Sequence, residues 1–156
     1  MPRIRYLKPE FFKDEHLAEL PHWVRLLFAG LWNIADKAGR LEDRPKRIKA
    51  EIFPYEEVDM EKGLSLLSKP KNGSNRPFIV RYVVNNEGYI QILNWDKHQK
   101  PHHTEAESKI PPAPPLNTKG MEKGMEKGMG SVEQALPKLD NAQITVKQQL
   151  KEVIDD

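Results

Sequence analysis

The hydrophobic pattern predicts three helices in the first 70 residues. From Pro21 to Lys37 the apolar residues recur at helical spacing, and Pro21 suits the first turn of such a helix. Pro45 opens a second predicted helix, which is expected to run to about Phe53, before Pro54. We expect Asp59 to cap a third helix, whose apolar face carries Met60, Leu64 and Leu67.

The next stretch of the chain predicts a β-hairpin. Two runs rich in β-branched and aromatic residues, Phe78 to Val84 and Tyr89 to Trp95, are separated by Asn85-Asn86-Glu87-Gly88. Asn at the first position and Gly at the fourth predict a type I turn closed by a left-handed glycine bulge. Shorter extended segments are expected at residues 3–8, as a strand, and at residues 39–43.

This order of elements predicts the fold. Helix, short strand, helix, helix, strand, turn and strand follow one another in a winged helix, and such small elements bury their apolar faces only by packing together. We therefore expect an α+β class, with a winged helix-turn-helix head made of a helical triad and a small antiparallel sheet.

Composition divides the chain. All three Trp, four Tyr and five Phe lie between Tyr6 and Trp95, and the later residues include IPPAPP and GMEKGMEKGMG. These tracts are typical of flexible linkers. We expect a winged-helix DNA-binding domain at residues 1–104, a flexible Pro/Gly-rich linker at 105–136 and a short amphipathic docking helix at 137–156 within a disordered tail.

Charge points to a polyanionic partner for the head. Residues 1–100 carry 18 Lys and Arg against 14 Asp and Glu, whereas residues 101–156 carry 7 against 9. On the second predicted helix, the basic residues lie opposite Ile48 and Ile52, and such a face suits DNA phosphates. The residues are Arg44, Lys46, Arg47 and Lys49. A solvated surface neutralised in part by neighbouring acidic residues is the equal alternative.

The third predicted helix and the loop after it supply further candidates. They are Lys62, Ser65, Lys69, Lys71 and Arg76. The helix begins with acidic residues, Glu56 to Glu61, which repel phosphate, so we expect modest sequence specificity. The alternative is that these lysines only keep the helix soluble.

Two more basic segments complete the candidate set. The N-terminal arm carries Arg3, Arg5 and Lys8, which suit a minor groove or a phosphate backbone unless they only protect an edge strand. Lys97 and Lys100 lie in the segment KHQKPHH. Its three histidines have no carboxylate at metal-ligand spacing before Glu105, so no metal site is expected.

Several protein classes are not expected. The sequence lacks GxxxxGK[ST], GxGxxG, HExxH and GxSxG, so we expect no enzyme and no cofactor. It contains no cysteine, which suits a cytoplasmic protein. Its longest apolar run, Leu26 to Trp32, is much shorter than the roughly 20 residues of a membrane span, so no membrane partner is expected.

A combination of segments resembles a known family. KPEFF, RLLFAGLWNIAD, RPKRIKAEIFPY and KHQKPH are similar to phage replication proteins, the N-terminal winged-helix domains of replisome organisers and DnaD-like primosome proteins. The resemblance covers about residues 3–103. It implies binding at a replication origin, with Arg44, Lys46, Arg47 and Lys49 facing DNA and with Ile48, Ile52 and Phe53 in the core. The loop Lys69 to Pro77 is longer than the family's usual connection.

The expected function is therefore that of a DNA-binding accessory protein for phage-type replication initiation. By analogy with the family, the replicative helicase or its loader is a possible partner of the C-terminal helix. A homo-oligomer is a separate possibility. The alternatives are a winged-helix transcriptional regulator, and a protein interaction module that does not bind DNA.

Overall fold

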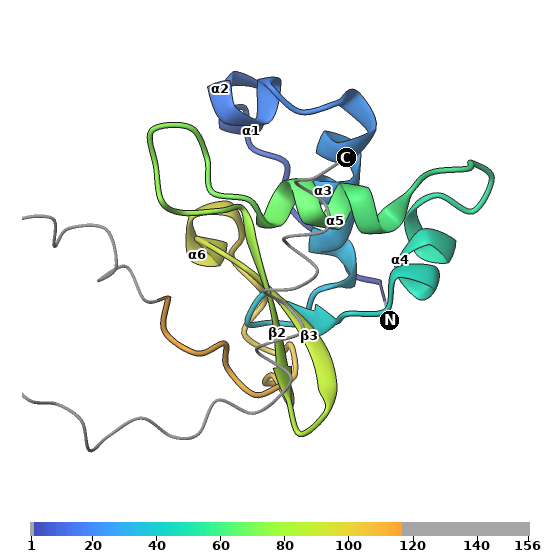
Figure 1. Cartoon of the computed structure of the whole chain (residues 1–156). Coiled ribbons are helices and arrows are strands. Elements are labelled where there is room, and N and C mark those ends of the chain that lie inside the picture. The colour runs from blue at the N-terminus through green and yellow to red at the C-terminus, as the bar shows by residue number, and fades with distance from the viewer. Residues whose placement is uncertain (1, 117–156) are drawn as a thin grey trace, which may run out of the picture. The chain divides into compact units, whose positions relative to one another are not determined.

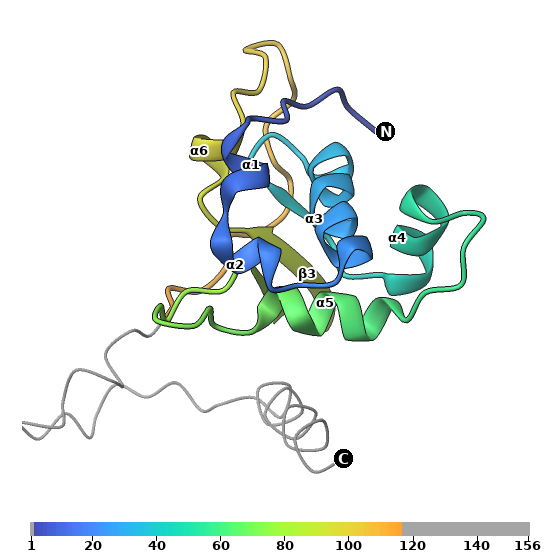
Figure 2. The same ribbon diagram turned by 90° about the horizontal axis from the view of Figure 1, so that it is seen from above.

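The computed structural model describes residues 2–116. These residues, up to Pro115, form one folded unit of six helices and a three-stranded sheet (Figures 1 and 2). The elements, in chain order, are α1 (Glu10–Lys13), α2 (Glu15–Ala18), α3 (His22–Ile34), β1 (Arg40–Glu42), α4 (Pro45–Ile52), α5 (Met60–Ser68), β2 (Ile79–Val84), β3 (Glu87–Ile92) and α6 (Trp95–His98). The expected α+β class is confirmed.

The three strands form an antiparallel sheet in the order β1-β3-β2. Leu41 of β1 and Arg81 of β2 both lie opposite Ile90 of β3. Since side chains alternate between the faces of a sheet, Leu41, Ile90 and Ile92 share the face that meets the helices.

Helices α3, α4 and α5 pack against one another, and α5 also packs on β2 (Figure 2). The helices cross closely at two glycines. A Cβ atom at Gly30 of α3 would lie 2.8 Å from the Ile52 side chain, and one at Gly63 of α5 would lie 2.7 Å from the ring of Trp23. Both crossings need a residue without a side chain, so the helix propensity lost at Gly63 is offset by close packing.

Local signals placed these helices well. α4 begins at Pro45 as expected, and α5 begins after Asp59, whose carboxylate accepts a hydrogen bond from the Lys62 N–H at 3.1 Å. The short strand expected at residues 39–43 is β1.

The hairpin differs from the expectation at both ends. Its loop has two residues, Asn85 and Asn86, with φ of 51° and 63°. This is the pattern of a type I′ turn, whose twist matches that of the strands, so the predicted glycine bulge is wrong. β3 stops at Ile92 rather than Trp95, because Asn94 adopts a left-handed conformation and α6 begins at Trp95.

The N-terminal arm, residues 2–8, is extended but belongs to no strand, so the strand predicted there is wrong. It lies against α3 instead, where the Arg3 N–H donates to the Asn33 carbonyl at 2.8 Å. The Asn33 side-chain amide donates to the Arg3 carbonyl at 2.6 Å. A helix C-terminus and side chains therefore satisfy the backbone that a neighbouring strand was expected to satisfy.

Residues 105–111, here called the strap, remain attached to the folded unit. Arg40 donates to the Ile110 carbonyl at 3.0 Å, and the Tyr82 hydroxyl donates to the Pro111 carbonyl at 2.7 Å. Tyr82 points away from the helices, yet it is only 6% exposed because the strap covers it. The folded unit extends to Pro115, so the boundary predicted after residue 104 falls inside it.

The rest of the predicted linker, and the docking helix predicted at residues 137–156, lie outside the described residues.

Candidate nucleic-acid interface

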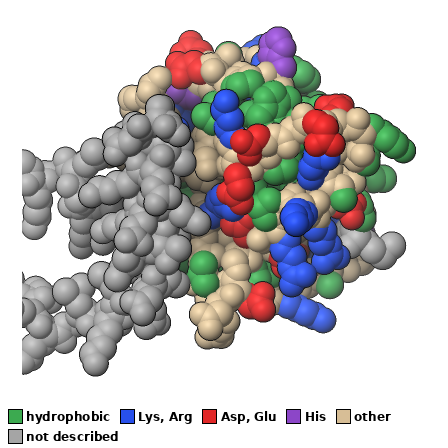
Figure 3. Space-filling model, turned by 45° about the vertical axis from the view of Figure 1, so that its right-hand side comes forward, with side chains coloured by type: hydrophobic (Ala, Val, Ile, Leu, Met, Phe, Trp, Pro, Cys, Tyr) green, Lys and Arg blue, Asp and Glu red, His purple; other side chains and the backbone are tan. Residues whose placement is uncertain are grey.

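The first candidate surface is the outer face of α4. Ile48 is 2% exposed and faces the core, while Lys46 and Arg47 point to solvent. Figure 3 shows Lys and Arg side chains gathered in the lower right of the view, on the side where α4 lies in Figure 1. The eight-residue helix thus presents its basic residues together, as the helical spacing predicts. We call Arg44, Lys46, Arg47 and Lys49 the α4 patch.

Acidic neighbours partly neutralise the α4 patch. Glu42 lies 2.9 Å from Arg44 and 3.8 Å from Arg47, and Lys49 lies 3.8 Å from Glu57. Among residues 2–116, Lys46 makes no ion pair. The paired carboxylates are 46% and 100% exposed, and water screens ion pairs this exposed, so they hold the cations weakly. A phosphate therefore competes readily for these cations.

The second candidate surface is the outer face of α5 with the loop that follows. Lys62, Lys69 and Arg76 are exposed, and Ser65 is half-buried. Lys71 is used differently, because its ammonium group lies 4.2 Å from the centre of the Phe78 ring. Burial lowers the pKa of Lys71, an effect that the nearby Asp14 opposes. We therefore exclude Lys71 from the phosphate-binding surface.

One acidic residue at the start of α5 is neutralised by an arginine that sequence reasoning missed. Arg81 of β2 donates to Asp43 at 2.6 and 2.9 Å and to Glu61 at 2.8 and 3.1 Å. Burial alone would lower the pKa of Arg81, but its hydrogen bonds with Glu61 and Asp43 raise it. The sequence does contain an indication of this role, because Arg81 is a single cation on the apolar face of a predicted strand. Its two carboxylate partners join the hairpin to α5 and to the segment before α4.

Both arginines of the N-terminal arm bind groups of the folded unit, although 31% of the Arg3 side chain remains exposed. The Arg5 side chain is 5% exposed and donates to both carboxylate oxygens of Glu105, at 2.6 and 2.8 Å. It also donates to the Trp32 and Ala35 carbonyls, and its guanidinium lies 5.2 Å from the centre of the Trp95 ring. Arg3 shares Glu105 at 2.9 Å. Both arginines hold the fold together, so we exclude them from the DNA-binding set.

The other cations of this region remain near the surface. Lys97 and Lys100 are exposed, and half-buried Lys8 donates to the Lys97 carbonyl at 2.5 Å. Burial lowers the pKa of His98, and the charges of Lys71 and Lys8 lower it further. Both effects favour the neutral form of the His98 imidazole.

Other kinds of site were also searched for. No three His, Asp or Glu side chains within residues 2–116 lie close enough together to hold a metal ion. In the same part of the chain, no helix is both long and apolar enough to cross a membrane.

Comparison of the chain with protein-family models, with curated proteins and with solved structures gives no significant match. The physical properties of the surfaces described above are therefore the basis for a functional assignment.

Proposed function

We propose that this chain is a DNA-binding protein with a winged-helix head, acting as an accessory protein in phage-type replication initiation. In this proposal α4 and α5 form the helix-turn-helix, and β2 and β3 form the wing. The α4 patch binds the phosphates of duplex DNA, assisted by Lys62, Lys69 and Arg76. The replication role and the helicase or its loader as a partner rest on the sequence resemblance.

The observation that best supports the proposal is the order and pairing of the elements. A helix, a short strand, two helices and a hairpin follow one another, and the first strand pairs with the last. This order and pairing, with three helices packed on a small antiparallel sheet, support the proposed winged helix. Connectivity alone does not imply DNA binding, so the inference that the chain binds DNA rests on the charge of its surface.

The charge of the α4 patch supports phosphate binding rather than base reading. Lys46 and Arg47 stand on a helix whose opposite side is anchored by buried Ile48, so their positions are set by the fold. Each phosphate that such a cation neutralises releases bound counterions, which stabilises the complex at low salt. The exposed acidic side chains of Glu56 and Glu57 beside α5 disfavour deep insertion of α5 into a groove. We therefore expect strong salt dependence and modest sequence preference.

The test is a pair of double variants of the full chain. Lys46→Ala/Arg47→Ala removes two charges from the α4 patch, and Lys13→Ala/Lys109→Ala removes two exposed charges elsewhere. Duplex affinity is measured by fluorescence anisotropy between 50 and 300 mM salt. The α4 variant should reduce the slope of log K against log salt by about 2, since each phosphate contact contributes about 0.9. The control should leave the slope within about 0.5 of the original.

Equal slopes in the two variants would contradict an α4 interface. Thermal melting checks that both variants fold, and the α4 variant should melt close to the parent because Ile48 remains buried.

A protein interaction module that does not bind DNA is the second candidate. It is favoured by the acidic start of α5 and by Tyr55, which is 97% exposed between α4 and α5. Absence of duplex binding by the parent chain at 50 mM salt would favour this candidate over the first.

A further inference from the structure

Side chains along the N-terminal arm alternate between the interior and solvent. Arg3 and Arg5 point inward to Glu105, whereas Ile4 is 98% exposed and Tyr6 is 63% exposed. This alternation is that of an extended chain, in which successive side chains point to opposite sides. The arm therefore holds an aromatic ring at the surface while its neighbours anchor it.

The backbone at Tyr6 is fixed by a buried side chain. The Tyr6 N–H donates to Gln99 Oε1 at 2.8 Å, and Gln99 Nε2 donates to the Tyr6 carbonyl at 2.8 Å. Gln99 is 1% exposed, so its side-chain amide hydrogen-bonds to the arm rather than to solvent. Together with the contacts of Arg5, it holds Tyr6 in place before any ligand arrives, which reduces the entropy cost of binding.

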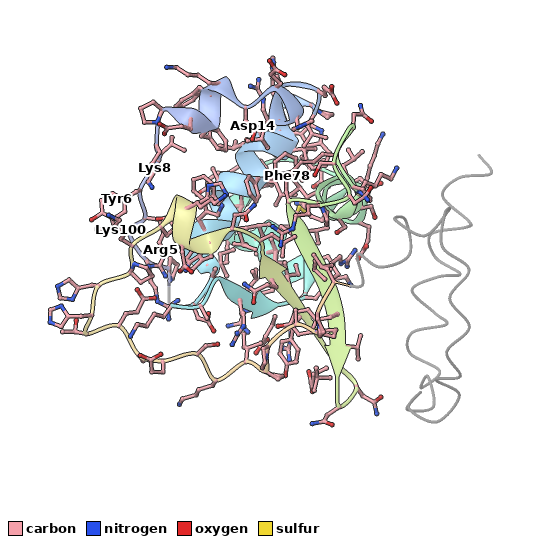
Figure 4. All side chains as sticks on the ribbon, turned by 90° about the vertical axis from the view of Figure 1, so that its left-hand side faces the viewer. Arg5, Tyr6, Lys8, Asp14, Phe78 and Lys100 are labelled. Atoms are coloured by element: carbon pink, nitrogen blue, oxygen red, sulfur yellow. The ribbon has the colours of Figure 1, made fainter. Side chains whose placement is uncertain are left out.

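Tyr6 borders a shallow hollow of about 210 Å³. Its walls include Lys100, Pro101 and His102 on one side and the arm on the other. Figure 4 shows Tyr6 and Lys8 of the arm next to Lys100 from the segment after α6, with Arg5 nearby. An exposed aromatic ring next to several cations suits a ligand that has both flat apolar groups and negative charges.

Single-stranded DNA fits this combination. Unpaired bases stack on exposed aromatic rings, and the backbone follows nearby cations. A duplex keeps its bases stacked inside and offers no base to Tyr6. Acidic neighbours do not neutralise the positive charge of these lysines. Glu105 is paired with Arg3 and Arg5, and Asp96 is the one exposed acidic residue of α6.

We propose that Tyr6, Lys97 and Lys100, together with Lys8, form a binding site for single-stranded DNA, in which a base stacks on Tyr6 and phosphates lie on the lysines. The choice of DNA as the nucleic acid rests on the proposed function. Figures 1 and 2 place α4 and α6 on opposite sides of the folded unit, so this site is separate from the α4 patch. One head could then hold a duplex on one side and an unpaired strand on the other.

The experiment measures the affinity of the full chain for a labelled 12-nucleotide oligo(dT) and for a 20-base-pair duplex. Tyr6→Ala should weaken oligo(dT) binding roughly 5- to 150-fold, the range for loss of one base–aromatic stack. Tyr6→Phe, which keeps the ring, should stay within about 3-fold. Tyr55→Ala removes a tyrosine that lies outside the hollow and is more exposed than Tyr6, at 97%, and it should leave oligo(dT) binding unchanged. Tyr6→Ala should leave duplex affinity unchanged.

The salt dependence of oligo(dT) binding tests Lys97 and Lys100. Lys97→Ala/Lys100→Ala should reduce the salt slope for oligo(dT) by about 1.4, since each phosphate on a single strand contributes about 0.7. The duplex slope should not change, whereas Lys46→Ala/Arg47→Ala should show the reverse pattern. Either proposal, the duplex interface at the α4 patch or the single-strand site at Tyr6, can therefore be contradicted while the other stands.

Four results would overturn the single-strand site. The first is that the parent chain fails to bind oligo(dT), and the second is that Tyr6→Ala binds it as well as the parent does. The third is that Tyr55→Ala loses as much affinity as Tyr6→Ala, and the fourth is that oligo(rU) of the same length binds more tightly than oligo(dT). Melting temperatures confirm that the variants fold, as expected because Gln99 contacts only the backbone of residue 6.

Discussion

Glu105 is expected to stabilise the folded unit although it lies beyond the boundary that composition suggests. Its side chain is 13% exposed, and it accepts hydrogen bonds from both Nη atoms of Arg5, whose side chain is 5% exposed. Glu105→Gln removes the negative charge and places a donor against one of these nitrogens. One Nη of the buried guanidinium then loses its carboxylate acceptor and the ion pair is broken, which costs about 1.5–3 kcal/mol.

For a domain of this size, 1 kcal/mol shifts the melting temperature by roughly 3–6 °C. Glu105→Gln should therefore lower the melting temperature by about 5–15 °C. The matched control is Glu107→Gln in the same strap, because Glu107 pairs with Lys37 but is 84% exposed. An ion pair this exposed contributes about 0–1 kcal/mol, so the control should melt within about 3 °C of the parent.

The effect of Glu105 should also depend on pH. The hydrogen bond from Arg5 lowers the pKa of the Glu105 carboxyl below its usual 4.5, despite the opposing effect of burial. Stability from such a group is complete above the unfolded pKa and is lost as the pH falls through the folded pKa. The gap between parent and Glu105→Gln should therefore be constant above about pH 5.5 and shrink below pH 4.5. A gap that is absent at pH 7, or equally large in Glu107→Gln, would refute this reasoning.

Two further predictions concern α5. Gly63→Ala should destabilise the protein by roughly 1 kcal/mol in urea unfolding, because crowding against Trp23 outweighs the gain of about 1 kcal/mol in helix propensity. Stabilisation by the full propensity gain would show that Trp23 moves aside freely. Asp59→Ala should cost about 1 kcal/mol through loss of the N-cap, whereas Asp59→Asn should cost much less because Asn caps equally well. Equal losses in the two variants would mean that the charge of Asp59, not its hydrogen bond, stabilises α5.

The candidate site was only partly predictable from charge. Lys46 and Arg47 were placed correctly, because a helix with buried Ile48 must turn its basic side outward. Arg5 looked equally available, but Glu105 binds it from 100 residues away. No local pattern distinguishes a cation that faces solvent from one that a distant carboxylate neutralises.

What the sequence by itself determined was the local structure. Helical spacing of apolar residues, Pro45 at a helix start and Asp59 as an N-cap act within a few neighbouring residues, so α3, α4 and α5 lie close to where they were predicted. Only the tertiary structure decided the role of the strap, which falls within the predicted linker but covers Tyr82. It likewise decided which side chains of the N-terminal arm face solvent. The physical reason is that these contacts join residues far apart in the chain, and their energy depends on burial and on partners that exist only after the domain has folded.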